Sequence, residues 1–253
     1  PQFEKLRVIK FLLKHKTSWD LPEVQMQYKE CCFKLIAKKE VDILEIKNLY
    51  KKYSDIPVID NLSMTLRSGQ RAAISGASGE GKTSLLNIIL GLRDYDSGTV
   101  LKHEKLHLLT VFQEDRLFPS FDALDNIGIY PYPFVKETAL EILKKLELGD
   151  VCDKPAAEYS GGMKRRLAIA RALYGCTALH AHKPGEPLLL IMDEPFKGLD
   201  PKLRKKVIDT VDDIVCRTGS ALILVTHESG EAVSLGCEQI ALKPKRRDVN
   251  RWH

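Results

Sequence analysis

Short apolar runs that stop abruptly at polar residues recur along this chain of 253 residues. The clearest runs are 188–192 and 221–225, in which every residue is apolar. Runs of this length are typical of strands that are buried on both faces of a parallel sheet. The segments 71–75 and 106–112 are largely apolar as well. We therefore expect four buried strands that belong to one sheet.

Between these strands, apolar residues recur at helical spacing. Nearer the start of the chain, 44–46 and 58–66 predict two further strands, which places the start of the compact domain near Val41. Strands that alternate with helices are typical of an α/β fold. We also expect a turn at 96–99 and a helix stop at Gly149. The predicted helices are 85–91, 122–129, 136–148, 164–173 and 201–215.

A loop that fits a phosphate-binding pattern joins the first of these strands to the first helix. Residues 76–84 read Gly-Ala-Ser-Gly-Glu-Gly-Lys-Thr-Ser, which matches G-x-x-x-x-G-K-[ST]. Glycines let backbone N–H groups turn inward around a triphosphate, and the helix N-terminus adds positive potential. Lys82 would bridge the β- and γ-phosphates, and Thr83 would offer its hydroxyl to magnesium. The candidate ATP-binding residues here are Gly76, Ala77, Ser78, Gly79, Gly81, Lys82, Thr83 and Ser84.

Polar residues directly follow three of the buried strands. Asp193 and Glu194 follow 188–192, His227 comes soon after 221–225, and Gln113 follows 106–112. Two acids at the end of a buried strand are costly unless they serve a cation or a reaction. Asp193 fits a magnesium site and Glu194 fits a general base for water. Gln113 is placed to reach a metal or a water beside the phosphates.

Two further features fit a nucleotide. Ser160, Gly161 and Gly162 open the predicted helix 164–173, and such a start can form a second phosphate-binding nest. Tyr53 precedes the phosphate loop and has an aromatic face that can stack on adenine. Each feature alone has a structural alternative, namely a chance loop match, a plain helix cap, a packing tyrosine, a structural histidine or an ordinary strand-end side chain.

Charge is concentrated at the two ends of the chain, whose net charge is +5. Residues 1–40 hold nine basic residues against five acids, and residues 243–253 hold five against one, so the part between them is net negative. This argues against a nucleic-acid groove in the body of the domain. We expect 1–40 to be a basic helical extension, 41–242 the catalytic domain and 243–253 a basic tail. The segment 3–16 either lies on a membrane surface or a partner, or is a poorly packed extension.

The remaining composition excludes several classes of protein. The six cysteines form no C-x-x-C pair, which disfavours a zinc or disulfide framework. No apolar run approaches the roughly 20 residues that span a bilayer. The sequence begins with Pro1 and not with an initiator methionine, so both a fragment and a full-length chain stay open.

Together these motifs resemble the ATP-binding cassette ATPases, the motor subunits of ABC transporters. The resemblance covers about Leu44 to Glu231, and the order of its features is that of the family. The segment Phe-Gln-Glu-Asp-Arg-Leu-Phe-Pro at 112–119 resembles importers of the nitrate, sulfonate and taurine group. The signature carries Tyr159 and Met163 where the family usually has Leu and Gln, but it keeps the serine and glycines. The features are Tyr53, the phosphate loop, Gln113, Ser160-Gly161-Gly162, Asp193 with Glu194, Asp200 and His227.

The resemblance implies a P-loop NTPase core with a mainly parallel sheet, an N-terminal antiparallel β subdomain and a small helical subdomain at about 114–175. It implies a head-to-tail dimer, in which ATP lies between the phosphate loop of one subunit and Ser160, Gly161 and Gly162 of the other. Asp200 would also lie near the nucleotide. The implied catalytic residues are Glu194, His227 and Lys82, and the implied Mg²⁺ residues are Thr83, Gln113 and Asp193.

The implied partners are transmembrane permease subunits, a second ATPase subunit in a homodimer, and a solute-binding protein, with no nucleic acid. The chain would then lie peripherally on the cytoplasmic side of the cell membrane and drive import. One alternative is a cassette ATPase that works in DNA repair, on chromosomes or on ribosomes. Another is a regulatory P-loop protein that binds nucleotide without turnover, which Glu194 and His227 argue against. The transported solute is not encoded in these motifs.

Overall fold

The structure, a computed structural model, describes residues 41–76 and 79–242. The predictions made for 1–40, for Ala77 and Ser78, and for 243–253 lie outside the described residues. The described residues from Asp42 to Leu242 belong to one compact unit. Among the helices of the described part, none combines the length and the apolar character needed to cross a membrane.

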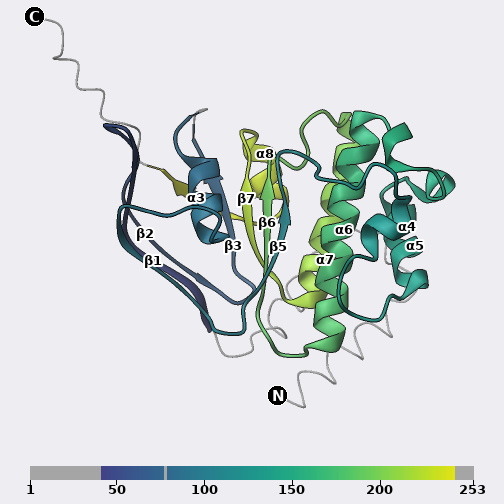
Figure 1. Cartoon of the computed structure of the whole chain (residues 1–253), viewed down its shortest axis with the longest axis horizontal. Coiled ribbons are helices and arrows are strands. Elements are labelled where there is room, and N and C mark those ends of the chain that lie inside the picture. Colours follow the sequence, from purple (N-terminus) through teal and green to yellow (C-terminus); the bar gives the residue numbers. More distant parts are fainter. Residues whose placement is uncertain (1–40, 77–78, 243–253) are drawn as a thin grey trace, which may run out of the picture. The chain divides into compact units, whose positions relative to one another are not determined.

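A five-stranded sheet forms the centre of this unit, and all of its strand pairs are parallel (Figure 1). All four predicted buried strands are present in it, because apolar residues on both strand faces have a packed layer to enter. The fifth strand, at one edge, was not predicted. In sheet order the strands are β5 (His107–Val111), β6 (Leu188–Asp193), β7 (Ala221–Val225), β3 (Arg71–Ser75) and β8 (Glu238–Ala241).

A second, antiparallel sheet has the order β2-β1-β4, with β1 at Asp42–Tyr53, β2 at Ile56–Arg67 and β4 at Ser97–Lys102. The predicted turn at 96–99 is wrong, because Ser97 already belongs to β4. Gly98 explains the pairing. Its φ is +99°, and a Cβ built on it would lie only 2.6 Å from the backbone oxygen of Asn48 on β1. Only glycine lets the two strands approach so closely.

The helices of the described part pack around the parallel sheet. Their number and order agree with the sequence pattern, apart from the short α8, which was not predicted. They are α3 (Lys82–Ile89), α4 (Ala123–Ile127), α5 (Lys136–Lys145), α6 (Gly161–His182), α7 (Pro201–Thr218) and α8 (Ser229–Ser234), with 3-10 turns η1 (Gly149–Val151) and η2 (Ala156–Glu158).

Two helix ends differ from the prediction. Glu147 rather than Gly149 takes the left-handed conformation after α5, with φ +54°, and the Leu148 N–H closes the end by donating to the Leu143 oxygen. The α6 helix runs on through His180 and ends at His182, past the predicted end at 173. Within this extension Gly175 allows close packing, because a Cβ there would be 2.5 Å from a Leu109 methyl carbon.

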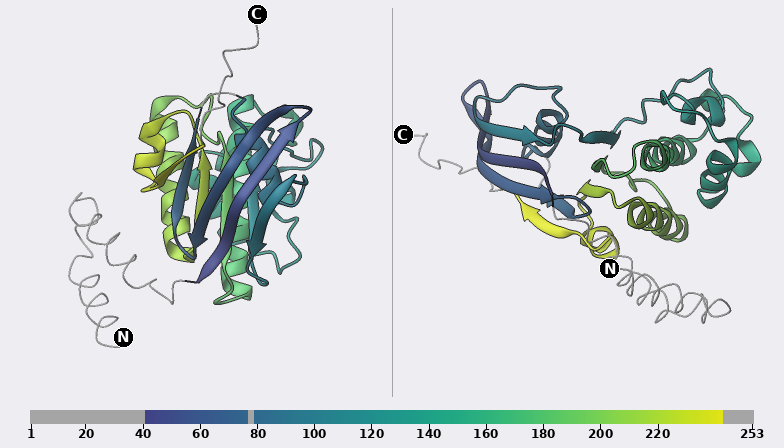
Figure 2. Two further views of the ribbon diagram at one scale, coloured as in Figure 1. Left: turned by 90° about the vertical axis from the view of Figure 1, so that its left-hand side faces the viewer. Right: turned by 90° about the horizontal axis from the view of Figure 1, so that it is seen from below.

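The parallel sheet separates two hydrophobic clusters. Along β6, Leu189 and Ile191 face the cluster that contains α3 and the antiparallel sheet, whereas Leu190 and Met192 face the cluster that contains α4 to α7. Figures 1 and 2 show α3 on one side of the sheet and α6 and α7 on the other. Every residue of β6 is buried, as a strand with a packed layer on each face requires.

One buried arginine ties α6 to the sheet. Arg165 is 6% exposed, and its guanidinium donates to backbone carbonyl oxygens. One of them is that of Phe112, directly after β5. Two more, those of Asp193 and Glu194 at the end of β6, lie at 2.6 and 2.8 Å. The guanidinium also donates to the Pro195 oxygen and pairs with the Asp115 carboxylate. The fixed fork of the guanidinium suits this many acceptors, which a lysine could not satisfy together.

We predict that Arg165→Met lowers the free energy of unfolding by at least about 3 kcal/mol, because several buried carbonyl oxygens lose their donor. Urea denaturation followed by circular dichroism measures the loss. The matched control is Arg217→Met, since Arg217 is half exposed and pairs with Asp213 at 3.0 Å on the surface of α7. That control should cost less than about 1 kcal/mol. Equal losses for the two variants would contradict the bridging role of Arg165.

Candidate nucleotide-binding and catalytic site

The phosphate loop leads from β3 into α3. Gly81 precedes the helix with φ +87°, and a Cβ there would lie 2.3 Å from the Val58 oxygen on β2, so this position requires glycine. The Lys82 side chain is 7% exposed, and its ammonium donates to the Gly76 oxygen at 2.7 Å. The lysine therefore reaches back across the loop. Its positive charge lies near the N-terminus of α3, and the charge and the helix N-terminus both favour an anion there.

Asp193 ends β6 next to the first turn of α3. It is 6% exposed, and burial raises the pKa of its carboxyl group, as does the neighbouring charge of Glu194. The charges of Arg165 and Lys82 and a hydrogen bond from Thr83 act in the opposite direction. A buried carboxylate beside a hydroxyl offers hard oxygen ligands of the kind that Mg²⁺ takes.

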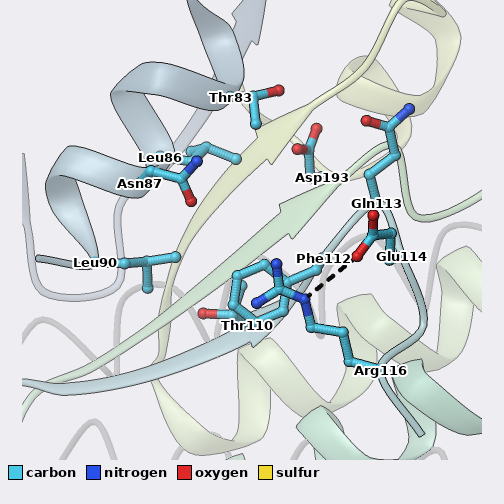
Figure 3. Close-up of a pocket in the computed structure, with 10 residues that line it drawn as sticks. All are labelled: Thr83, Leu86, Asn87, Leu90, Thr110, Phe112, Gln113, Glu114, Arg116 and Asp193. Carbon is cyan, nitrogen blue, oxygen red and sulfur yellow. Dashed lines mark ion pairs between the residues drawn. The ribbon is translucent and has the colours of Figure 1, made fainter. Parts of the chain in front are cut away.

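A cavity of about 120 Å³ adjoins Asp193 and Thr83 (Figure 3). Figure 3 shows Thr83, Asp193 and the side-chain amide of Gln113 around one end of the cavity, and Arg116 over the ring of Phe112 at the other. One cavity is therefore lined by all three residues, Thr83, Gln113 and Asp193, to which the resemblance assigned Mg²⁺, and that assignment stays a prediction. No cluster of three or more His, Cys, Asp or Glu side chains suited to a metal occurs among the described residues, so a cation here would rely on hydroxyl, amide and water oxygens as well.

Glu194 and His227 meet at the ends of β6 and β7. His227 Nε2 lies 2.9 Å from Glu194 Oε1, and Lys197 Nζ lies 3.0 Å from Oε2. The Glu194 N–H donates to the Val225 oxygen at 2.9 Å, and Glu194 has φ +46°, a conformation unusual for a residue with a side chain. Its pKa is lowered, mainly by the Lys197 hydrogen bond, with burial opposing and His227 adding to the effect.

These groups line a second cavity of about 230 Å³. The strained backbone of Glu194 turns its carboxylate out of the β6 ladder toward β7, which is how it reaches His227. Asp193 lines the first cavity and the next residue, Glu194, lines the second, so both cavities adjoin the end of β6. The residues around the second cavity are Glu194, Lys197, Gly198, Thr226, His227, Glu228 and Glu231.

Tyr53 ends β1 close to α3. Its hydroxyl lies 3.2 Å from the Ser84 hydroxyl, and the ring is 38% exposed. The Lys51 ammonium and the Arg93 guanidinium each lie 5.5 Å from the ring centre. The Tyr53 ring is therefore partly open, has cationic neighbours and lies beside the phosphate loop. Such a ring suits a heterocyclic base that carries phosphates.

The remaining predicted residues lie with the helices on the opposite face of the sheet. Ser160 caps α6 by accepting from the Met163 N–H, and Gly161 and Gly162 form the first turn of that helix. Asp200 caps α7 in the same way through the Leu203 N–H at 3.0 Å. These caps satisfy the local backbone, and α3 lies across the sheet from them (Figure 1). One chain thus holds two separate phosphate-binding candidates.

Two side chains near the site were not predicted from the sequence. Arg165 binds the backbone at Phe112, Asp193 and Glu194, and Lys197 binds the Glu194 carboxylate directly. The signals were present but weak: Arg165 is the middle one of three consecutive basic residues, 164–166, and Lys197 lies three positions after an acid. Neither pattern specifies a contact without the fold.

Comparison with known proteins places these features in a family. A family model described as "ABC transporter" matches residues 59–197. The aliphatic sulfonates import ATP-binding protein SsuB 1 of Nocardia farcinica is 37% identical over 209 residues, which are 82% of this chain and 80% of the relative. The spermidine/putrescine import ATP-binding protein PotA of Thermotoga maritima is 34% identical over 215 residues. The chain covers only 55% of that longer relative and of several others with the same name.

Solved structures agree with these relatives. The dimeric ATP-binding cassette MJ0796 in a post-hydrolysis state, bound to ADP and Pi, superposes with a TM-score of 0.66 at 26% identity and covers 79% of this chain and 94% of its own. The match includes both the parallel sheet and the antiparallel sheet that the motifs implied. On the combined family match, relatives and fold, the chain belongs to the ABC transporter family, as one of its ATP-binding cassettes.

Proposed function

We propose that this chain binds and hydrolyses ATP and couples the reaction to solute movement through separate permease subunits. The observation that carries the proposal is the meeting, at one edge of the parallel sheet, of the Lys82 loop, the buried Asp193 and the Glu194–His227 pair. Buried charges and a strained backbone reduce stability. A role in stabilising the fold alone therefore does not account for the Lys82 loop, Asp193 and the Glu194–His227 pair at the same end of the sheet.

The triphosphate would bind along the loop that Gly76, Gly79 and Gly81 open, with Ser84 beside it. Lys82 would exchange its bond to the Gly76 oxygen for a bond to the β- and γ-phosphates, which is the stronger charge-assisted contact. The Tyr53 ring would stack on adenine. Ala77 and Ser78 complete the loop in sequence and stay predictions, since they lie outside the described residues.

Mg²⁺ would be held by Thr83 and Asp193, with Gln113 at the edge of the same site. The residues fit the ion, since a hydroxyl, a carboxylate and an amide oxygen are hard donors around a cavity of about 120 Å³. When bound, magnesium offsets the negative charge that develops on the phosphate oxygens. The raised pKa of Asp193 is consistent with a carboxylate that lacks a full counter-charge.

Hydrolysis would use Glu194 as the general base. Its carboxylate would accept a proton from water, whose oxygen attacks the γ-phosphorus as the bond to ADP breaks. His227, 2.9 Å from the same carboxylate, would orient Glu194 and contact the γ-phosphate. Lys82 would stabilise charge in the transition state. A glutamate is ionised at neutral pH, and the hydrogen bond from Lys197, which lowers the pKa of Glu194, makes its carboxylate a weaker proton acceptor.

A second subunit would complete each site. Ser160, Gly161 and Gly162 lie across the sheet from α3, so the signature of one chain is best placed to reach nucleotide that is held by another. Asp200 begins the neighbouring helix α7 and would lie at the same interface. The dimeric arrangement of MJ0796 supports this arrangement, and we propose a homodimer of the head-to-tail type.

The biological setting that we propose is an importer. The relatives in the comparisons are import ATP-binding proteins for aliphatic sulfonates and for spermidine or putrescine, and the sulfonate relative matches over most of both chains. We propose transmembrane permease subunits and a solute-binding protein as partners, with this chain peripheral on the cytoplasmic side of the cell membrane.

We further propose that residues 41–242 are the ATPase domain and that the basic tracts 1–40 and 243–253 are not needed for nucleotide binding. The compact unit begins at Asp42, and the family match starts at residue 59. A fragment of residues 41–242 should fold and bind ATP with the affinity of the whole chain, measured by titration calorimetry. A folded fragment that binds no ATP would show that a terminal tract belongs to the site.

Glu194→Gln tests the base assignment, because it keeps the size and shape of the side chain but removes the carboxylate that accepts the proton. We predict that turnover falls by about 10²–10⁴-fold while ATP still binds. ATP should then accumulate in a stable dimer, which gel filtration with and without ATP detects. Adding Ser160→Arg should abolish that dimer, because a long cation would occupy the place of the partner's γ-phosphate.

Lys82→Ala is the matched negative control, since it should lose nucleotide and form no dimer. A Glu194→Gln protein that hydrolyses ATP at the wild-type rate would refute the catalytic assignment. An ATP-dependent dimer that survives Ser160→Arg would refute the assignment of the second phosphate nest.

A further inference from the structure

We propose that Lys197 restrains the hydrolysis rate by occupying the carboxylate oxygen of Glu194 that must accept the proton of the attacking water. This inference rests on the proposed function of Glu194 as the base. It adds a residue that neither the sequence motifs nor the family resemblance assigned, and it predicts an unusual result: removing a charged side chain beside the site increases activity.

The geometry of the Glu194 carboxylate leads to this assignment. His227 Nε2 holds Oε1 at 2.9 Å, and Lys197 Nζ holds Oε2 at 3.0 Å. The side chain of Glu194 is only 15% exposed, so little of its surface is open to a third partner. Both oxygens therefore already accept a hydrogen bond from a cationic or potentially cationic group.

The two partners of Glu194 differ in a way that separates their roles. His227 follows β7 and reaches Glu194 across the sheet edge, which orients the carboxylate relative to the strands. Lys197 comes from the same loop as Glu194, three residues later, and its side chain is 68% exposed. Because both residues belong to one loop, the Lys197 contact does not fix the Glu194 carboxylate relative to another element. Lys197 therefore occupies Oε2 without orienting the carboxylate.

Other cations near the cavity have different partners. Arg204 pairs with Glu228, and its distance to Glu231 is 3.7 Å. Glu231 is buried and also accepts from the Thr226 hydroxyl at 2.5 Å. Within the described part of the chain, Lys197 and His227 are therefore the two basic side chains that contact the Glu194 carboxylate.

The chemical consequence concerns one proton transfer. When water attacks, its O–H bond breaks, the proton passes to a Glu194 oxygen, and the new P–O bond forms as ADP leaves. A general base must be within hydrogen-bond reach of the proton it takes. Each carboxylate oxygen has two lone pairs, so the water either displaces one of the two donors or shares an oxygen with it. Lys197 is the more exposed of the two donors, so its contact at Oε2 is the one that the water disturbs. An exposed ion pair of this kind is weak, so the restraint is modest and can be overcome at every turnover.

The opposite role for Lys197 is direct assistance, in which its ammonium would leave Glu194 and stabilise the γ-phosphate. That role predicts a lower kcat when the lysine is removed, whereas the restraint predicts a higher one. The sign of the change therefore decides between them, and a loss of folded protein cannot imitate an increase.

The experiment compares kcat and KM for ATP of the whole chain at saturating magnesium. Lys197→Ala and Lys197→Met should raise kcat by about two- to fivefold, the largest factor that one exposed ion pair supports, and leave KM unchanged. Lys197→Arg restores the cation and should keep the wild-type kcat. The matched control is Lys206→Ala, since Lys206 is a similarly exposed lysine that pairs with Glu147 away from both cavities and should leave kcat unchanged.

The double variant Lys197→Ala with Glu194→Gln locates the effect. If Lys197 acts through Glu194, the double variant should be as slow as Glu194→Gln alone. An unchanged or lower kcat in Lys197→Ala, or a faster double variant, would overturn the inference. Those results leave the proposed function intact as long as Glu194→Gln itself is slow, whereas a wild-type rate in Glu194→Gln would refute the proposed function instead.

Discussion

The parallel direction of five neighbouring strands is the constraint on which the site depends. Because all of them run the same way, the residues that follow them emerge at one edge of the sheet. The phosphate loop follows β3, Gln113 follows β5, and His227 follows β7, while β6 itself ends in Asp193. Reversing one strand would move its polar residue to the far edge, so the chemistry of the site is set first by backbone topology.

Arg165 adds a second constraint, which links this edge to the helical side. It lies one turn into α6, whose first residues carry the signature, and it binds backbone oxygens next to Gln113 and Glu194. A shift of α6 relative to the sheet would therefore strain the positions of both residues. We infer that the signature end and the catalytic edge keep a fixed spacing, so that two chains in a dimer can complete each other's sites.

The sequence predicted the elements that depend on local patterns better than those that depend on neighbours. All four buried strands and the starts of the helices that follow Ser160 and Asp200 were predicted from runs and spacings. Strand β4, the full length of α6 and the Lys197 contact were not. Gly98 permits strand pairing and Gly175 permits helix packing because of atoms far away in sequence. When only the neighbouring residues in the sequence are considered, both glycines look like positions that interrupt a strand or a helix.

The claim that ties these observations together is that one chain holds two halves of two different sites. The most direct measurement is the initial ATP hydrolysis rate per subunit, at saturating Mg-ATP, over a wide range of protein concentration. The account predicts a rate per subunit that rises with concentration and then levels off as the dimer forms. A rate per subunit that stays constant down to the lowest concentration, with monomers confirmed there by light scattering, would contradict it.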